Sequence, residues 1–345
     1  MKNTVVILVV AAIVVVGVWF FVQKSKPGNG TQGAGQVVVY TAQDQEYAEP
    51  LLKMFEEQTG IKVIPKYDAE ATKTVGLAGQ LLQEKDNPQC DLFWGNEPLH
   101  TVRLAKAGVF EAYTPKTWDL FPDGFKDKNA MWTGFGARAR VFVVNTTRPG
   151  FDTIKGLDDL LRPEFKGKLC MPKPLAGTAT TQMAALYSLW GKEKFTTWFK
   201  GLMANDVRML DGNSFVADGV GSAEYTAGIT DIDDAISRKE KRGMKIEIVF
   251  SDADGMGCLV FPETLSIIKG CKNAQNAKML YDWMLMDRTE LWMCNSPAAQ
   301  IPLNRNLKAP VGRYDISSIK AMKVDWNKVA EVYDEAAALL KELTK

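Results

Sequence analysis

The sequence predicts an α/β protein in which two lobes enclose a ligand cleft, and three observations support this fold class. Short apolar runs alternate with amphipathic, helix-like segments between about residues 37 and 110. A second alternating series follows between about residues 139 and 261. Such alternation predicts βαβ units and parallel sheets. Acidic and other polar residues follow several of the predicted strands, at the edge of the sheet where α/β folds bind ligands.

The first series begins with the apolar run 37–40, which predicts a buried strand. Hydrophobic residues at helical spacing predict a helix over 46–58, and Thr59-Gly60 is a suitable C-cap. A strand over 61–67 completes a βαβ unit, so a parallel sheet is expected. The same pattern then repeats with a helix over 74–85, a strand over 91–94 and a helix that begins at Pro98.

The second series begins with a predicted strand over 139–144. Its other strands are expected at 168–171, 207–210, 227–230, 245–250 and 258–261, with two helices between 178 and 203 and one over 233–241. The segment 257–268 is suited to lead the chain back to the first sheet, and helices over 273–286 and 326–343 are expected to pack outside. We therefore predict one lobe from residues 37–137 plus about 264–345, and a second from 138–263. The cleft between two such lobes is a favoured place for a ligand.

The N-terminus differs from a globular composition. Residues 5–22 are eighteen consecutive apolar or small residues, roughly 27 Å long as a helix and close to the thickness of a bilayer core. A cleavable signal peptide is the alternative, but bulky Trp19, Phe20 and Phe21 stand where small residues should precede the cut. We expect a transmembrane anchor, or an uncleaved signal, over 1–24 and a flexible linker over 25–36.

Charge and residue usage exclude several classes of protein. The 42 basic and 41 acidic residues give no net attraction to nucleic acid, so no nucleic-acid partner is expected. The single histidine, His100, argues against histidine-based catalysis, a histidine-rich zinc site and a Ser-His-Asp triad. The five cysteines form no C-x-x-C pair, which argues against a zinc site built from them. We expect neither an enzyme nor a prosthetic group.

Three aspartates follow the predicted strand 227–230. Asp231, Asp233 and Asp234 stand where this strand passes into the next predicted helix, at the ligand-binding edge of an α/β sheet. Acids in a first helical turn also cap free N–H groups and complement the helix dipole, by about 0.3–1 kcal/mol each. On this stretch alone, capping and ligand binding remain equally open.

Two further strand-end loops carry carboxylates or amides. Asp44 follows the first predicted strand, and Asn96 and Glu97 precede Pro98 after the strand 91–94. Each of these residues suits the start of the following helix as well as a ligand.

Two other loops suit an anion. Ala176, Gly177 and Thr178 lead into a helix with small residues and a hydroxyl, which leaves backbone N–H groups available to an oxyanion. Ser214 belongs to another helix entry, and Arg138, or Arg140, would supply a guanidinium to the same anion. A capped helix and a surface arginine are the alternatives.

Several stretches are similar in order and spacing to a known family. They are VVVYTAQDQEYAEPLLKMFEEQTGIKV (37–63), CDLFWGNEPLHTVRLAKAGVFEAY (90–113), GARARVFVVNTT (136–147), PLAGTATTQMAALYSLWG (174–191), GNSFVADGVGSAEYTAGITD (212–231), GMGCLVFPETLSIIKGCKNAQNAKMLYDWML (255–285) and IPLN (301–304). On these stretches, residues 37–343 resemble the periplasmic solute-binding proteins of ABC importers, specifically the ferric-ion-binding branch. The resemblance implies a two-lobed periplasmic-binding-protein fold that captures a small ligand for an ABC permease in the membrane.

The resemblance also implies roles for particular residues. Asp44 and Glu97, the latter beside Asn96, stand near positions of family metal ligands, and Asp233 and Asp234 stand where two adjacent tyrosines usually complete an iron site. Ala176, Gly177 and Thr178 match the loop that holds a synergistic anion, and Arg138 matches the family arginine. The implied metal ligands are therefore Asp44, Glu97, Asp233 and Asp234.

We therefore expect a monomeric, membrane-anchored solute-binding protein, with its soluble domain on the periplasmic or extracellular side of the cell membrane. Its ligand would be a hard metal cation such as iron with a co-bound oxyanion, because carboxylates suit hard cations. Carboxylates suit organic ammonium groups as well, so an aminophosphonate or another small zwitterion is the alternative ligand. An anchored sensor domain without transport is the alternative function.

Overall fold

The computed structural model of the protein describes residues 35–68, 74–307 and 314–345. The predicted anchor, and the predicted linker up to residue 34, lie outside the described residues. Within the described ranges, no helix has both the length and the apolar composition that crossing a bilayer requires. Residues 35–345 form one compact unit, which is described below.

The first βαβ series forms a parallel sheet, as the alternation predicts. Strand β1 (Gln36–Thr41) lies between β2 (Lys62–Tyr67) and β3 (Leu92–Gly95), and both pairings are parallel. The helices of this series are α2 (Gln45–Thr59), α3 (Val75–Gln83) and α4 (Pro98–Lys106). Gly60 ends α2 with a φ of 73°, the left-handed conformation that favours glycine, which confirms the predicted C-cap.

Two long antiparallel strands lie in the middle of the sheet. β5 (Thr133–Asn145) and β10 (Val260–Ile268) pair with each other, β10 also pairs with β3 and with the short β4 (Phe110–Glu111), and β5 pairs with β8 and β9. The sequence predicts only residues 139–144 and 258–261 as strand. The observed strands are longer than the predicted ones. Polar residues within them, such as Arg138 and Glu263, interrupt the apolar pattern of the sequence but are buried and hydrogen-bonded inside the protein.

The second series confirms the predicted order of elements. Its strands are β6 (Leu169–Pro172), β7 (Arg208–Leu210), β8 (Ala227–Asp231) and β9 (Ile246–Val249), and its helices are α5 (Gly177–Ala204), α6 (Asn213–Gly221) and α7 (Ile232–Ile236). Gly191 interrupts α5 with a φ of 77° and a ψ of 166°, so this segment is two helices, as predicted. The predicted helix 233–241 is instead the short α7 followed by a π-helical turn, Ser237–Lys241.

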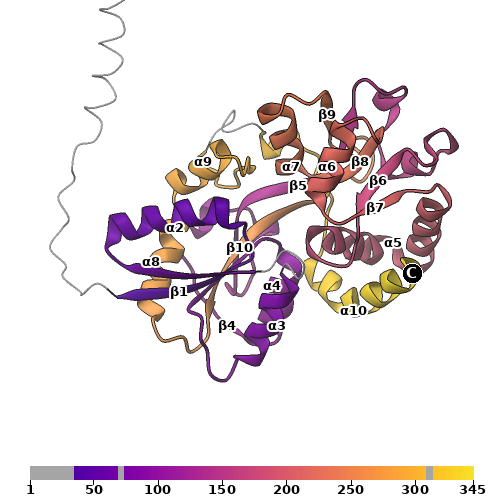
Figure 1. Cartoon of the computed structure of the whole chain (residues 1–345). Helices are drawn as coiled ribbons and strands as arrows, with labels where there is room; N and C mark the ends of the chain where they lie inside the picture. The colour runs from indigo at the N-terminus through magenta and orange to yellow at the C-terminus, as the bar shows by residue number, and fades with distance from the viewer. Residues whose placement is uncertain (1–34, 69–73, 308–313) are drawn as a thin grey trace, which may run out of the picture. The chain divides into compact units, whose positions relative to one another are not determined.

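The strand order across the sheet is β2-β1-β3-β10-β5-β8-β6-β7 (Figure 1). We call β1–β4 with α2, α3, α4 and α8 (Ala274–Met284) the first lobe, and β6–β9 with α5, α6 and α7 the second lobe. The predicted lobe boundaries at 137/138 and 263/264 fall inside β5 and β10, so these two strands run through both lobes. The C-terminal α10 (Trp326–Leu343) packs against α5 and α4, and therefore contacts both lobes. The sequence did not predict α9 (Asp287–Asn295).

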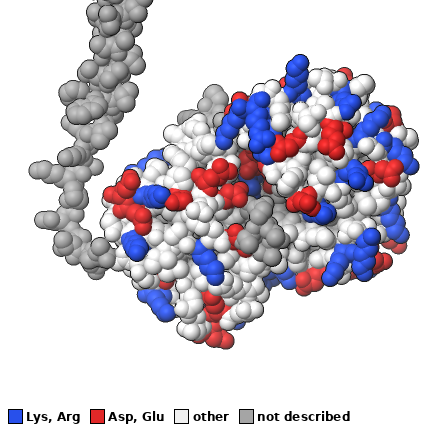
Figure 2. All heavy atoms as spheres, viewed as in Figure 1, with Lys and Arg blue, Asp and Glu red and all other residues white. Residues whose placement is uncertain are grey.

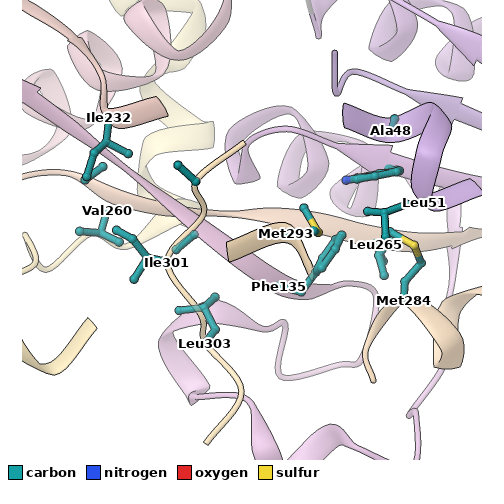
Figure 3. Packing of buried hydrophobic residues seen from close by; sticks show 14 of the residues in the cluster. Ala48, Leu51, Phe135, Ile232, Val260, Leu265, Met284, Met293, Ile301 and Leu303 are labelled. Carbon is teal, nitrogen blue, oxygen red and sulfur yellow. The ribbon is translucent and has the colours of Figure 1, made fainter. Parts of the chain in front are cut away.

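A hydrophobic core surrounds the two central strands (Figure 3). Phe135 of β5 and Leu265 of β10 are fully buried there, beside Leu51 of α2 and Met293 of α9. Burial of each such side chain contributes about 1.5–3 kcal/mol. The polar residues described next are therefore attached to a tightly packed frame.

Candidate cation-binding site between the two lobes

Polar side chains from both lobes line a cavity of about 720 Å³. Figure 2 shows a hollow on the visible face with acidic side chains along its edge. All of the predicted site residues except Glu97 line this cavity, namely Asp44, Asn96, Arg138, Ala176, Gly177, Thr178, Ser214, Asp231, Asp233 and Asp234. The structure therefore brings together loops that are far apart in the sequence.

Three carboxylates form a cluster in this cavity. β8 ends at Asp231 and α7 begins at Ile232, so Asp231, Asp233 and Asp234 occupy the strand-to-helix junction. Their ligand oxygens lie within 4.8 Å of one another. Asp231 is the N-cap residue of α7, but its side chain makes no capping hydrogen bond. Its geometry thus favours a role other than capping.

Asp233 is the most unusual member of the cluster. Asp233 is only 8 % exposed, and its Oδ1 atom has no hydrogen-bond partner among the described residues. Its Oδ2 atom lies 3.7 Å from Nη1 of Arg138. Burial raises the pKa of Asp233 to about 6, opposed by the charge of Arg138 and reinforced by those of Asp231 and Asp44. A bound cation would favour its charged form.

The charged form of Asp234 is also disfavoured. Burial, and then the charges of Asp233 and Asp231, raise its pKa well above the ordinary range, while Arg238 opposes this. Nη1 of Arg238 lies 3.4 Å from Oδ1 of Asp234. Arg238 is shared, because it also donates to Asp218 at 3.0 Å. In the absence of a cation, the surroundings of Asp233 and Asp234 therefore disfavour a negative charge on both side chains.

Asp231 has a different environment, because it is surrounded by donors. It accepts hydrogen bonds from Arg140 Nη1 at 2.8 Å, Thr178 Oγ1 at 2.7 Å and Asn213 Nδ2 at 3.0 Å. Arg138 Nη1 lies 3.6 Å from its Oδ2. Burial alone would raise the pKa of Asp231, but the charges of Arg140 and Arg138 outweigh burial and lower it. Asp231 is therefore held as a stable carboxylate.

Arg138 connects the two lobes through the middle of β5. Its Nη2 donates to the backbone oxygen of Asn96 at 2.7 Å, while Nη1 is near Asp231 and Asp233. Its Nε has no partner among the described residues. Asn96 is held in turn by Thr74, whose Oγ1 donates to Asn96 Oδ1 at 2.6 Å. The first-lobe loop and the second-lobe acids thus share one guanidinium.

Glu97 differs from the sequence-based expectation. It is fully buried and caps α4, accepting from the N–H groups of Leu99 at 2.6 Å and His100 at 2.9 Å. Thr181 Oγ1 donates to it as well, at 3.0 Å. Glu97 does not line the cavity, and both of its oxygens are engaged. Of the four predicted metal ligands, only Asp44, Asp233 and Asp234 line the cavity.

Two helix N-termini also line the cavity. Gly177 and Thr178 begin α5, and Asn213 and Ser214 begin α6. The first N–H groups of a helix have no partner within the helix and attract anions. The cavity thus contains donors for negative groups beside acceptors for positive ones.

Tyr47 is a lining residue that the sequence analysis missed. Burial, and then the charge of Asp233, raise its pKa, so the phenol is protonated at neutral pH. A signal was available, because Tyr47 is three residues after Asp44 in the first turn of the predicted helix. Residues at this spacing share one face of a helix.

A two-lobed α/β fold with a polar cavity between its lobes defines a ligand-binding protein. Residues 91–332 match the family described as "Bacterial extracellular solute-binding protein", and the chain belongs to this family. The family and the fold are therefore those of solute-binding proteins.

Individual relatives are distant but cover nearly the whole chain. The "Fe(3+)-binding periplasmic protein" of Serratia marcescens is 24 % identical over 88 % of this chain and 90 % of that protein. Among solved structures, iron-bound HitA from Pseudomonas aeruginosa has a TM-score of 0.80 and 22 % identity, covering 90 % of this chain and 99 % of that one. AfuA from Actinobacillus pleuropneumoniae, with fructose-6-phosphate bound, has a TM-score of 0.76 and 22 % identity, covering 90 % and 98 %. At this identity the two structures establish the fold alone.

Proposed function

We propose that this protein captures a hard metal cation of the iron type for an ABC importer, together with an oxyanion group that balances the charge. The observation that carries the proposal is the unpartnered Oδ1 of buried Asp233, within a cluster of three carboxylates that lines the cavity. The names of the Serratia marcescens and Pseudomonas aeruginosa relatives, which refer to iron, support a metal cargo.

The chemistry of the cavity supports a cation at Asp233 and Asp234, with Asp44 contributing from the first lobe. Carboxylate oxygens are hard ligands suited to Fe³⁺, Mn²⁺, Ca²⁺ and Mg²⁺. Burial and neighbouring acids raise the pKa values of Asp233 and Asp234, and a bound cation would favour the charged forms of both carboxylates. Glu97 is left out of this set because it caps α4.

The oxyanion group would lie at the N-termini of α5 and α6. Ala176, Gly177, Thr178 and Ser214 line that part of the cavity, and Arg138 is near the same acids. Backbone N–H groups at helix N-termini suit an oxyanion.

A zwitterion such as an aminophosphonate is the second candidate ligand, and the volume of the cavity favours it. About 720 Å³ is within the range of pockets for small organic molecules. The amine would lie on Asp233 and Asp234 and the phosphonate at the helix N-termini. The organic phosphate named for AfuA is consistent with this fold accepting such a molecule.

Thermal unfolding separates the two candidates. Melting temperatures of the wild type would be measured with ferric citrate, Mn²⁺, Ca²⁺, phosphate and aminoethylphosphonate in turn. A ligand at 100 times its dissociation constant adds about 2.7 kcal/mol of stability. We expect a cation to raise the melting temperature and aminoethylphosphonate to leave it unchanged. A shift with aminoethylphosphonate and with no cation would support the second candidate instead.

Two matched variants identify the site in the same experiment. Asp234→Asn removes a carboxylate of the cluster, and we expect it to abolish the cation shift. Asp211→Asn removes a carboxylate that also lines the cavity but forms an exposed ion pair with Lys173 at 2.6 Å. Asp211→Asn should keep the cation shift. Loss of the shift in both variants would indicate a general electrostatic effect and not a cation site.

Transport, anchoring and a monomeric state are part of the same proposal. The partner would be an ABC permease, and residues 1–24 would hold the protein at the extracytoplasmic face of the membrane. Cargo uptake by vesicles that contain the permease and its ATPase, with and without this protein, would distinguish transport from a sensor role.

A further inference from the structure

The side-chain donors beside the expected oxyanion site are already occupied by a side chain of this protein. Thr178 Oγ1 and Asn213 Nδ2 both donate to Oδ2 of Asp231, at 2.7 and 3.0 Å. Arg140 Nη1 donates to Oδ1 of the same carboxylate at 2.8 Å. Asp231 thus sits among the side-chain donors at the start of α5 and α6, where an oxyanion would otherwise be held.

These donors are fixed in position by other contacts. Arg140 is almost completely buried, its Nε donates to Gln182 Oε1 at 3.0 Å and its Nη1 also donates to Asn213 Oδ1 at 2.6 Å. Asn213 Nδ2 donates to Thr178 Oγ1 as well, at 3.1 Å. Because Thr178, Asn213 and Arg140 bond to one another, the donor set is preorganised around a single carboxylate.

The charges match this arrangement. Two buried guanidinium groups, those of Arg138 and Arg140, lie within 3.6 Å of Asp231. Without the Asp231 carboxylate, Arg140 would have no ion-pair partner among the described residues. A buried uncompensated charge is costly, so the site requires an anion whether it comes from the chain or from solution.

We propose that Asp231 is a built-in counter-anion, whose carboxylate occupies the donor set of Thr178, Asn213 and Arg140 so that the cation binds without an oxyanion from solution. This inference rests on the proposed cation capture and identifies the oxyanion group of that site as part of the chain. Asp233 and Asp234 then hold the cation, while Asp231 neutralises the arginines beside it.

Asp231→Asn tests the inference by chemical rescue. The variant keeps the shape of the side chain but leaves Arg138 and Arg140 without its charge. We expect inorganic phosphate, with no metal present, to raise the melting temperature of Asp231→Asn and to leave that of the wild type unchanged. The control Asp206→Asn removes an exposed carboxylate that pairs with Lys166 and does not line the cavity, and it should respond like the wild type.

Cation titration provides the second readout. In phosphate-free and carbonate-free buffer, Asp231→Asn should bind Mn²⁺ about 10–100-fold more weakly than the wild type, as is typical when the groups around metal ligands are changed. Added phosphate should restore most of this affinity in the variant and change wild-type affinity less than twofold.

The outcomes separate this inference from the proposed function. If phosphate stabilises the metal-free wild type or strengthens its Mn²⁺ binding, then Asp231 yields its place to a free anion and the inference is wrong. A folded Asp231→Asn variant whose melting temperature does not change with phosphate also contradicts the inference. If neither Mn²⁺ nor another cation binds the wild type while phosphate rescues only the variant, the counter-anion role stands and cation capture fails. If the variant does not fold, the wild type still provides a test. Mn²⁺ binding in phosphate-free and carbonate-free buffer that phosphate does not strengthen supports the inference, and binding that needs phosphate contradicts it.

Discussion

The carboxylate of Asp233 is buried, with Oδ1 unpartnered among the described residues and with Asp231 and Asp234 close by. Such an arrangement is costly to an empty protein, because burial, together with the charges of the neighbouring acids, raises the pKa of Asp233 to about 6. Arg138, at 3.7 Å, offsets only part of this cost. Residues that destabilise the empty protein in this way are found where a ligand completes the site.

Asp233→Asn should therefore stabilise the empty protein and weaken cation binding. Since the folded pKa is raised, the ionised carboxylate opposes folding above about pH 6, and removing it should add on the order of 1–3 kcal/mol at pH 7. Urea unfolding would measure this gain, and calorimetric titration with the cargo cation should show at least about a tenfold loss of affinity. Unchanged affinity would remove Asp233 from the site.

The sequence predicted the position of most site residues but not how each one is used. Asp231, Asp233 and Asp234 were recognisable because a small-residue strand leads into a helix there, which puts them at the ligand edge of the sheet. Glu97 satisfies the same sequence criteria and yet caps α4 with both oxygens. Capping and ligation require the same residue types at the same positions, so only the geometry distinguishes them.

Strand β10 links the fold to the site through a buried carboxylate. The register of the β10–β5 pairing shifts between Pro262 and Glu263. The Glu263 carboxylate accepts hydrogen bonds from the side chains of Gln43, Gln300 and Trp94, the last at 2.5 Å. Gln43 Oε1 in turn accepts the backbone N–H of Asp44 at 2.8 Å. Glu263 thus helps to position the first-lobe loop of the cavity.

Glu263 should also make stability depend on pH. Burial raises its pKa from 4.5 to about 7, opposed by the charge of Arg138 and by the hydrogen bonds from Gln300 and Trp94. Because the folded protein binds this proton more tightly, its contribution is complete below pH 4.5 and is lost as the pH rises to about 7. The total is on the order of 3 kcal/mol.

Glu263→Gln tests this expectation when its unfolding free energy is compared with that of the wild type at several pH values. The difference between the two proteins should change between pH 4.5 and 7 and be constant outside this window. A difference that does not vary across the window would show that Glu263 has an ordinary pKa in the fold.

Helix α5 owes its division into two helices to one glycine. Gly191 has a φ of 77° and a ψ of 166°, a region that residues with a Cβ avoid, although nothing lies within 4 Å of the place a Cβ would occupy. Gly191→Ala should therefore cost about 1–3 kcal/mol through the backbone alone. Gly79→Ala, within α3 and with equal free space, should instead add about 0.5–1 kcal/mol. Urea unfolding of both variants checks the contrast, and equal effects would contradict it.

Elements with a clear period were predicted well, and those set by tertiary contacts were not. The 3.6-residue pattern of α10 and the Gly60 cap of α2 are local, so their boundaries follow from the sequence. β5 extends over thirteen buried residues that include Arg138 and Arg140, whose burial depends on partners far along the chain. Because these polar residues break the apolar pattern, the sequence predicted only part of this strand.

At the level of the whole protein, the alternation of strands and helices was enough to predict two α/β lobes around a cleft. It did not predict that β5 and β10 would join both lobes in one sheet, because pairing between strands about 125 residues apart leaves no local pattern. It also placed α10 in the first lobe, whereas α10 packs against α5 of the second lobe as well as α4. Long-range packing is the part that the sequence alone did not provide.

In the proposed function, a single hard cation binds the acidic cluster at the junction of β8 and α7. Equilibrium dialysis against Mn²⁺ and against ferric citrate, followed by elemental analysis, measures this most directly. We predict one metal ion per chain for the wild type and for Asp211→Asn, and none for the double variant Asp233→Asn/Asp234→Asn. A wild type that retains no metal, or a double variant that retains as much as the wild type, would show that this cluster is not a cation site.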